Sequence, residues 1–456
     1  MGVGVRILFF RFSYFVRLVA ASLILIGFWP QDALAQTRIN LIRDAEIETI
    51  IRNYATPLFE AADLDPAAIG IHIVANPRLN AFVAAGQHLF LNTGLLIEAA
   101  NASQVIGVIA HETGHIAGGH LIRGQEALRG ASMQTLIAAI VGIGVGIATG
   151  NGQATSAILT GGSGIATSNF LQFSRGQEAA ADQAGLSFLE ETDQSATGFL
   201  EFLEILEKQD LLSSRRQSPY LRTHPLTRDR VSFVREYVNT HPGGTEPSPE
   251  ITKSFRRIQA KLIGFMQPFR RVMRHYPKSD TSLEARYAHS IAYYRREEID
   301  RALPLIDGLI ELEPDNAYFH ELRGQMLFEN GRLEESLPSY KNAVRLDPSS
   351  ALLRMGLAHV QLEIPDSREN HPAMEHLLYA IEKERDNPQI WQLLAIGYGR
   401  EKAYGMSALA LAEKALRLGD KVTAIQQATR AQKKMPKGSP GWIRAQDIKI
   451  TTNLHP

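Results

Sequence analysis

Between residues 44 and 92, the spacing of hydrophobic positions changes from that of a helix to that of short strands. In residues 44–61 apolar side chains recur every three or four positions, which predicts an amphipathic helix with a buried face made of Ile47, Ile50, Ile51, Tyr54 and Leu58. Apolar runs bounded by turn residues then predict three strands, at 69–74 (IGIHIV), 80–83 (NAFV) and 88–92 (HLFLN). We therefore expect an amphipathic helix followed by a small sheet.

A longer apolar segment follows, with the sequence SQVIGVIAHETGHIAGGH at residues 103–120. No proline interrupts it, so it is predicted to be a buried helix with Asn101 or Ser103 as its N-cap. Three ionisable residues stand inside the apolar pattern, namely His111, Glu112 and His115. Burying three such groups together is costly unless something pairs them.

These three residues form the pattern H-E-x-x-H, which by itself also arises by chance. Side chains four positions apart lie on one face of a helix, so His111 and His115 can bind one ion together. Zinc suits two neutral imidazoles at about 2.0–2.1 Å and prefers four ligands. Glu112 would lie beside the open position, where it could take a proton from the attacking water and pass it to the leaving amine. The helix is therefore predicted to carry a catalytic zinc site, with one ion per chain.

A second helix is predicted at SRGQEAAAD, residues 174–182, where Glu178 and Asp182 lie four positions apart. Its alanines would let it approach the first helix closely, so Glu178 is the candidate third zinc ligand. Asp182 would then accept a hydrogen bond from a ligand imidazole and orient it. The alternative is a solvated acidic face, although residues 179–181 are all alanine.

The position of the next histidine separates two classes of zinc protease. The pattern H-E-x-x-H-x-x-G-x-x-H would need a histidine at position 121, which is Leu121. His120 comes one position early and points elsewhere on the helix, where it would be structural or lie near the cleft. This spacing favours a glutamate as the third ligand.

The second half of the chain has a different pattern, which begins after the Pro/Gly-rich linker at 241–250. Pro314 and Pro348 lie 34 residues apart, the period of tetratricopeptide repeats. Other positions fit that repeat when phased on the two prolines, including Tyr293, Ala302, Gly324, Tyr340, Ala343, Trp391, Leu394, Ala395, Tyr398, Ala424, Ala431 and Pro436. We expect about four repeats in 281–440, one of them irregular near residues 365–372, and the alternative is a generic helical bundle.

Two flanking segments complete the predicted layout of the second half. Residues 251–280 are expected to hold one connecting helix, at 251–276, and residues 441–456 a C-terminal tail. Arginines are predicted along the exposed side of the connecting helix, at Arg256, Arg257, Arg270, Arg271 and Arg274. Such a run is typical of a solvated face.

Composition narrows the class of protein. A chain of 456 residues is too long for one ordinary core, so two or three domains are expected. Lys+Arg and Asp+Glu both number 48, which gives no indication of a nucleic-acid partner. Cysteine is absent, which excludes disulfides, thiolate zinc sites and a cysteine nucleophile.

The N-terminus indicates export. Three arginines precede the apolar run Leu18–Trp29, and Ala33-Leu34-Ala35 supplies a small-x-small cleavage site. A cleavable signal peptide is therefore predicted at 1–35. The alternative is a membrane anchor, but the run is short of the ~20 residues that a spanning helix needs. A second apolar segment with many glycines, 136–168, is compatible with a buried helix, a flap over the cleft or a segment touching the membrane.

Together, HETGH at 111–115 and SRGQEAAAD at 174–182 resemble HtpX-type gluzincin metallopeptidases, a group that includes the CAAX prenyl proteases and the Oma-type proteases. The resemblance covers about residues 42–238 and implies zinc held by His111, His115 and Glu178. It also implies that Glu112 is the general base and that Asp182 supports the site. Thr223-His224-Pro225 resembles a late segment of the family, in which the histidine lies near the metal and stabilises the intermediate or occupies the fourth position.

The segment NAFV also fits the family pattern upstream of the metal helix. An edge strand here could hold an extended peptide by main-chain hydrogen bonds, which makes Asn80, Ala81 and Phe82 candidate substrate-binding residues. The alternative is a sheet that only supports the helix.

The sequence therefore predicts a mainly α protein, in which an α+β zincin-like domain at 36–240 precedes an all-α tetratricopeptide solenoid. This layout resembles periplasmic β-barrel assembly-enhancing proteases of Gram-negative bacteria. The resemblance implies a periplasmic zinc endopeptidase, peripheral to the outer membrane, without a membrane anchor after signal cleavage. Its substrates would be misfolded or stalled outer-membrane barrel proteins, and its repeats would dock those proteins or the assembly machinery. The alternative is a chaperone or assembly adaptor with latent protease activity.

Overall fold

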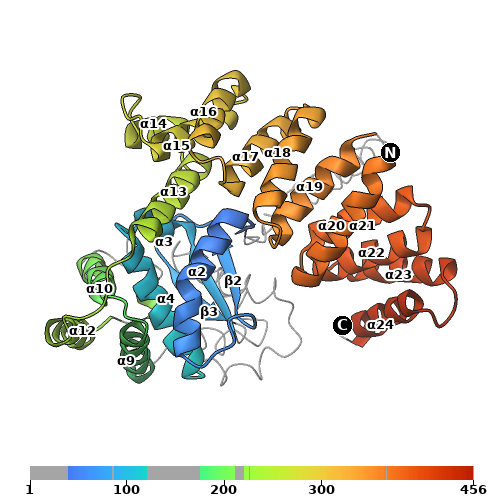
Figure 1. Ribbon diagram of the computed structural model, residues 1–456. Helices are drawn as coiled ribbons and strands as arrows, with labels where there is room; N and C mark the ends of the chain where they lie inside the picture. Colours follow the sequence, from blue (N-terminus) through green and yellow to red (C-terminus); the bar gives the residue numbers. More distant parts are fainter. Residues whose placement is uncertain are drawn as a thin grey trace, which may run out of the picture. The chain divides into compact units, whose positions relative to one another are not determined.

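The computed structural model describes residues 40–84, 87–120, 175–210, 220–224, 226–365 and 367–454. Figure 1 shows the succession of elements along the chain. The predicted signal peptide and the apolar segment 136–168 lie outside the described residues.

The sheet has four strands, β1 (Leu41–Ile42), β2 (Gly70–Val74), β3 (Ala81–Ala84) and β4 (His88–Asn92), in the order β1-β2-β4-β3. β2 and β4 are parallel, and the other neighbours are antiparallel. The three predicted strands are confirmed to within one residue at their starts and ends. β1 was missed because two residues are too few to show an alternating pattern. Within the described part of the chain, β3 forms one edge of the sheet.

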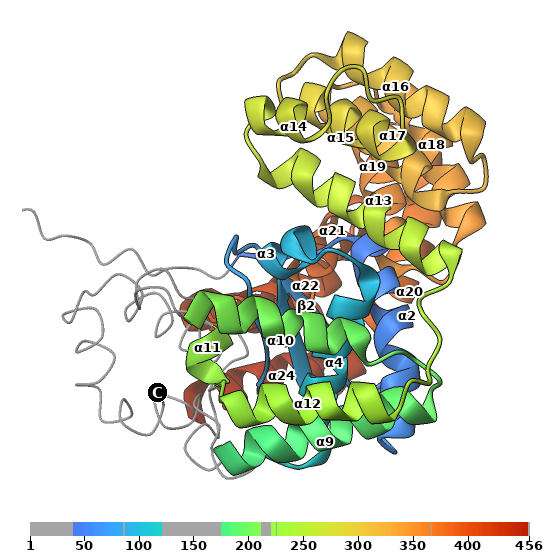
Figure 2. The same cartoon turned by 90° about the vertical axis from the view of Figure 1, so that its left-hand side faces the viewer.

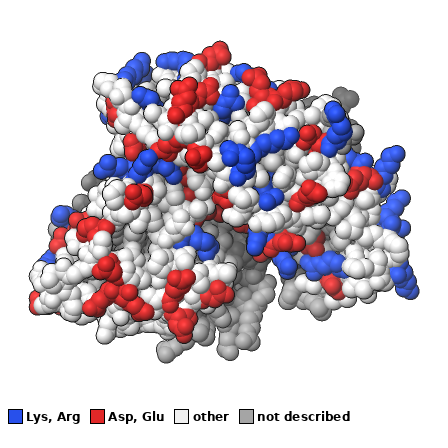
Figure 3. Space-filling view, in the orientation of Figure 1, with Lys and Arg blue, Asp and Glu red and all other residues white. Residues whose placement is uncertain are grey.

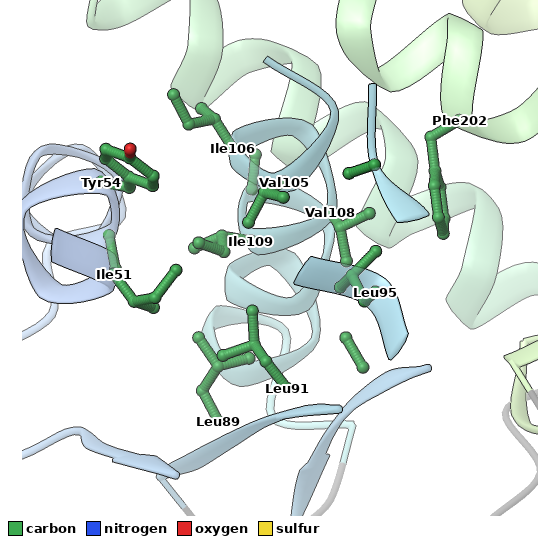
Figure 4. Packing of buried hydrophobic residues seen from close by; sticks show 14 of the residues in the cluster. Ile51, Tyr54, Leu89, Leu91, Leu95, Val105, Ile106, Val108, Ile109 and Phe202 are labelled. Atoms are coloured by element: carbon green, nitrogen blue, oxygen red, sulfur yellow. The ribbon is translucent and has the colours of Figure 1, made fainter. Parts of the chain in front are cut away.

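Helices α2 (Ala45–Ala61) and α4 (Ala102–Ala117) pack on the sheet. α2 begins at Asp44, whose side chain accepts a hydrogen bond from the Ile47 N–H at 2.9 Å. α4 begins at Asn101, whose side chain accepts a hydrogen bond from the Gln104 N–H at 3.0 Å. Of the two predicted N-caps, Asn101 is therefore the one that caps the helix. Figure 4 shows the core between these elements, built from Ile51, Tyr54, Leu89, Leu91, Val105 and Ile109. α4 is therefore held rigidly by apolar packing along its length.

The opposite side of α4 is covered by α9 (Arg175–Glu191) and α10 (Thr197–Asp210). α12 (Arg228–Thr240) packs on these two helices, and the short α11 (Tyr220–Thr223) packs on β3. Figure 2 shows α9, α10 and α12 on one side of the sheet domain. Phe199 and Phe202 of α10 are fully buried in the same core. The short α3 (Thr93–Glu98) joins β4 to α4.

The connecting segment differs from its prediction in two respects. It forms two helices, α13 (Pro249–Met266) and α14 (Phe269–His275), because Pro268 cannot continue the backbone hydrogen bonding of α13. Arg257 does not lie on an exposed face with the other arginines. Its guanidinium forms an ion pair with the buried carboxylate of Glu46 at the start of α2.

A buried network of charged groups joins α13 to α2. Glu46 is fully buried, and it accepts a hydrogen bond from the Tyr287 hydroxyl at 2.8 Å as well as pairing with Arg257. Lys261 of α13, also buried, lies 2.7 Å from Asp44, the cap of α2. Because a buried charge is costly unless it is paired, these contacts hold the first helices of the second half against the sheet domain.

The repeat region is a succession of antiparallel helices. Their bounds are α15 (Leu283–Tyr294), α16 (Ile299–Leu312), α17 (Ala317–Glu329), α18 (Leu333–Leu346), α19 (Ala351–Glu363), α20 (Asn370–Lys383), α21 (Pro388–Arg400), α22 (Tyr404–Arg417), α23 (Lys421–Lys434) and α24 (Pro440–Leu454). The irregular repeat contains a short 3-10 turn, Ser367–Glu369, before α20. Where a tail was expected, α24 packs on α23 through Ala445 and Ile448.

Small residues allow the repeat helices to pack closely. The Tyr340 ring lies so close to two glycines that a Cβ on Gly324 or Gly356 would be 2.7 or 2.6 Å from it. The predicted mainly α architecture, with a small sheet followed by repeats, is confirmed. On the face shown in Figure 3, acidic and basic side chains are intermixed over the repeat helices. No helix in the described ranges is both long and apolar enough to cross a bilayer.

Candidate metal centre

The two histidines of α4 face the same point. His111 and His115 are fully buried, and their Nε2 atoms lie 3.1 Å apart. This follows from their spacing of four residues, which places both imidazoles on one face of the helix. The rings meet edge to face at 85°, with their two Nε2 atoms at the point where they converge.

Helix α9 approaches this face of α4 very closely. A Cβ on Gly114 would lie 2.7 Å from the Ala181 carbonyl oxygen, and one on Gly185 would lie 3.0 Å from the backbone of Ala110. The close approach brings the Glu178 carboxylate to the two imidazoles, at 3.2 Å from His115 Nε2 and 3.5 Å from His111 Nε2. The sequence predicted that small residues would let the second helix approach the first closely, and α9 does approach α4 in this way.

A third imidazole completes the group. His224 follows α11, and its Nδ1 lies 3.1 Å from Glu178 Oε1 and 3.4 Å from His111 Nε2. The Tyr220 ring stacks on it with centroids 4.3 Å apart. One atom from each of His111, His115, Glu178 and His224 can be chosen so that all lie within 4.8 Å of one another. Three buried imidazoles and a carboxylate that converge in this way fit a metal ion with nitrogen and oxygen ligands.

Glu112 lies next to this group without belonging to it. Its carboxylate is fully buried, with Oε1 at 3.3 Å from His224 Nε2. Neither oxygen has a hydrogen-bond partner among the described residues. Burial raises the pKa of Glu112 above its ordinary value, which improves the match between this carboxylate and a proton acceptor at neutral pH.

Arg230, the third residue of α12, is the component to which the sequence analysis assigned no role. Its guanidinium donates to Glu178 Oε2 at 2.5 Å and to both Asp182 oxygens at 2.6 and 2.8 Å. Asp182 Oδ1 in turn lies 2.8 Å from Nδ1 of His111. The two buried carboxylates on α9 need a cation to balance their charge. The only hint of this cation in the sequence was that Arg230 follows His224 by six residues.

The protonation of the group in the metal-free chain follows from these contacts. Burial lowers the pKa of His111, but Asp182 and Glu178 outweigh it and raise that pKa to about 9. Burial lowers the pKa of His115 well below its ordinary value. Burial would raise the pKa of Glu178, but the His224, His111 and His115 imidazoles hold it well below the usual range. A metal that binds here must therefore displace a proton from His111.

The predicted substrate strand lies beside the centre. Asn80 immediately precedes β3, and Ala81 and Phe82 are its first residues. β3 contacts both α4 and α11, the helix that leads to His224. The Asn92 N–H donates to the Asn80 carbonyl at 3.0 Å, so residue 80 pairs with β4. Because pairing alternates along an antiparallel ladder, the backbone groups of Ala81 and Val83 point toward the edge of the sheet.

Replacing Gly114 by alanine is expected to separate α4 from α9. The added methyl group would press on the backbone of Ala181, at a cost of about 1–3 kcal/mol in the free energy of unfolding. It would also move Glu178 away from the histidines and weaken metal binding, which competition with a chelator would measure. Gly176→Ala, with nothing within 4 Å of its Cβ, is the control. Equal stability and affinity in the two variants would contradict the role of the close packing.

Comparison with known proteins supports the division of the chain. Peptidase family M48 matches residues 42–238, and a tetratricopeptide repeat family matches residues 287–360. The chain is similar to the beta-barrel assembly-enhancing protease of Escherichia coli (strain K12), at 24% identity over 367 residues, which cover 78% of this chain and 72% of the relative. The protein of that name from Yersinia pestis is 24% identical over 403 residues, covering 88% and 82%.

The protease half has a relative of higher identity. Metalloprotease LoiP of Escherichia coli (strain K12) is 31% identical over 217 residues, which cover 43% of this chain and 81% of LoiP. The M48 match at residues 42–238 spans the sheet, α4 and α9, and thus the elements that bring the buried histidines and Glu178 together. The chain therefore belongs to peptidase family M48, and it is a metallopeptidase followed by tetratricopeptide repeats.

Proposed function

We propose that this chain is a zinc-dependent endopeptidase in which His111, His115 and Glu178 hold the metal and Glu112 is the general base. The observation that carries the proposal is the convergence of these buried groups, with the Glu112 carboxylate beside them and lacking hydrogen bonds from the described residues. Two or three imidazoles with a carboxylate are a donor set that suits zinc. We keep the predicted domain limits, with the peptidase domain at 36–240 and the repeats at 281–440.

The residues of the chain divide the chemistry among them. When bound, zinc supplies a Lewis acid that polarises the scissile carbonyl and lowers the pKa of the attacking water. Glu112 accepts the proton of that water and delivers it to the leaving amine. Asp182 and Arg230 support this reaction indirectly, because their contacts hold His111 and Glu178 in place. His224 Nε2, which faces Glu112, is placed to stabilise negative charge on the substrate.

The substrate is an extended polypeptide that pairs with the edge of the sheet. The outward backbone groups of Ala81 would bond the main chain of such a peptide, next to α4 and α11. Phe82 does not face this peptide, since its ring is buried and stacks on Phe90 at 4.9 Å. Asn80 has a buried side-chain oxygen without a partner among the described residues. Recognition by main-chain contacts would make the enzyme tolerant of sequence and selective for unfolded chains.

The biological role is proposed from the relatives and from the layout of the chain. Two relatives that match most of this chain are named for enhancing β-barrel assembly. Together with the signal peptide predicted at 1–35, these names support a periplasmic enzyme that would degrade stalled outer-membrane barrel proteins. Stacked helix pairs present surfaces for protein partners, so the repeats dock substrates or the assembly machinery.

A second candidate is an assembly adaptor whose proteolysis is latent. The position of His224 favours it, because its Nδ1 already lies among the metal-binding atoms and would occupy the place that a substrate needs. His224→Ala separates the two. If the site is blocked at rest, this variant cleaves faster than the wild type, and if His224 assists the reaction, it cleaves more slowly.

The experiment that tests the main proposal uses purified residues 36–456, stripped of metal and then loaded with one equivalent of zinc. We expect cleavage of an unfolded outer-membrane barrel protein only after zinc is returned, and no cleavage of the same protein when folded. A chain that binds no zinc would overturn the proposal. Tight zinc binding without cleavage in the wild type and in His224→Ala would favour the adaptor.

A further inference from the structure

Each histidine of α4 has a partner on the side of its ring that faces away from the metal-binding group. For His111 this partner is Asp182, which lies 2.8 Å from Nδ1. For His115 it is His120, whose Nδ1 forms a hydrogen bond of 2.9 Å with Nδ1 of His115. The two rings meet at 73° with centroids 5.1 Å apart, so His120 approaches the edge of the His115 ring that carries Nδ1.

The end of α4 is shaped to bring His120 back to this position. The helix stops at Gly118, and Gly119 takes the left-handed conformation at φ +59°, which reverses the chain. The His120 N–H then donates to the His115 carbonyl at 3.2 Å. A Cβ on Gly118 would lie 2.5 Å from His120 Nε2, so a side chain at position 118 would push the returning ring aside.

We propose that His120 is a positioning residue that fixes the tautomer and the orientation of His115. This inference rests on the proposed metal site. In the tautomer that we propose, the Nδ1–H of His115 donates a hydrogen bond to Nδ1 of His120 across the 2.9 Å contact. Nε2 of His115 is then unprotonated and directed at the other ligands. His120 does not belong to the metal-binding group. Such a partner behind a ligand imidazole typically changes metal affinity about 10–100-fold.

The orientation of the His120 ring determines which replacements can substitute for it. Alanine removes the acceptor for the His115 proton, and His115 can then rotate or take the wrong tautomer. Asparagine places an amide oxygen near the position of the imidazole Nδ1, so it retains an acceptor. Gly118→Ala leaves His120 present but displaces its ring. These variants separate the hydrogen bond from the bulk of the side chain.

The test measures zinc affinity of residues 36–456 by competition with a chelator, and the thermal stability of the metal-free chain. We expect His120→Ala and Gly118→Ala to bind zinc about 10–100-fold more weakly than the wild type, and His120→Asn to recover most of the loss. His371→Ala, at an exposed histidine of α20, is the control.

Three results would overturn the inference. They are wild-type zinc affinity in His120→Ala, equal losses in the alanine and asparagine variants, and a fall in metal-free stability large enough to account for the weaker binding. Each of these would leave the proposed peptidase intact, since the wild type would still bind zinc. If the wild type itself bound no zinc, the proposed function would fail, and the inference with it.

Discussion

Replacing Glu112 by glutamine is expected to remove peptide-bond hydrolysis while leaving one zinc ion per chain. Glutamine has the shape of glutamate but cannot accept the proton of the attacking water, and general base catalysis contributes about 10²–10⁴-fold. Glu112 lies outside the group of converging ligand atoms, so zinc binding should not depend on it. The variant should fold normally, because neither carboxylate oxygen is hydrogen-bonded by a described residue.

Glu178→Gln is the matched variant, since it makes the same chemical change on the neighbouring helix. Here the lost charge belongs to a ligand that also pairs with Arg230, so zinc occupancy should fall. Zinc content by elemental analysis, measured beside cleavage of an unfolded barrel protein, distinguishes the two roles. Equal zinc loss in both variants would show that the base and the ligand had been assigned wrongly.

The helix and strands around the site were predictable because their signals are local. The apolar run before His111 and the spacing to His115 lie within one helix, and α4 begins at one of the two predicted caps. The prediction that Glu178 would lie near the histidines relied on the alanines beside it. The structure places these residues together, and their use as ligands remains a prediction until the metal is measured.

Features that depend on pairing across the fold were not predictable from one sequence. The spacing of Arg257 in its helix is that of a surface arginine. Only the position of Glu46 on α2 shows that Arg257 pairs with a buried carboxylate. By contrast, the break between α13 and α14 has a local cause, because Pro268 alone could have predicted that the connecting helix is divided. His224 follows a short helix far along the chain, so periodicity could not place it beside Glu112, and only the family resemblance put it near the metal.

Replacing Arg230 is expected to lower the stability of the protein strongly. Its guanidinium is buried and lies between two buried carboxylates of α9, those of Glu178 and Asp182. Replacing it by leucine leaves both charges without their cation in a region of low dielectric. Removal of one partner from a buried ion pair typically costs about 3–5 kcal/mol, so we expect a loss of this size in the free energy of unfolding.

The measurement is chemical denaturation of the metal-free protein, because bound zinc would neutralise part of the charge on Glu178 and mask the loss. Arg228→Leu, at the exposed first residue of the same helix, should change the free energy of unfolding very little. If zinc restores much of the stability of Arg230→Leu, the arginine and the metal share the task of balancing these carboxylates. Equal stability of the Arg230 and Arg228 variants would mean that the buried carboxylates do not need this cation, and its contacts could not then be what holds Glu178 and Asp182 in place for the histidines.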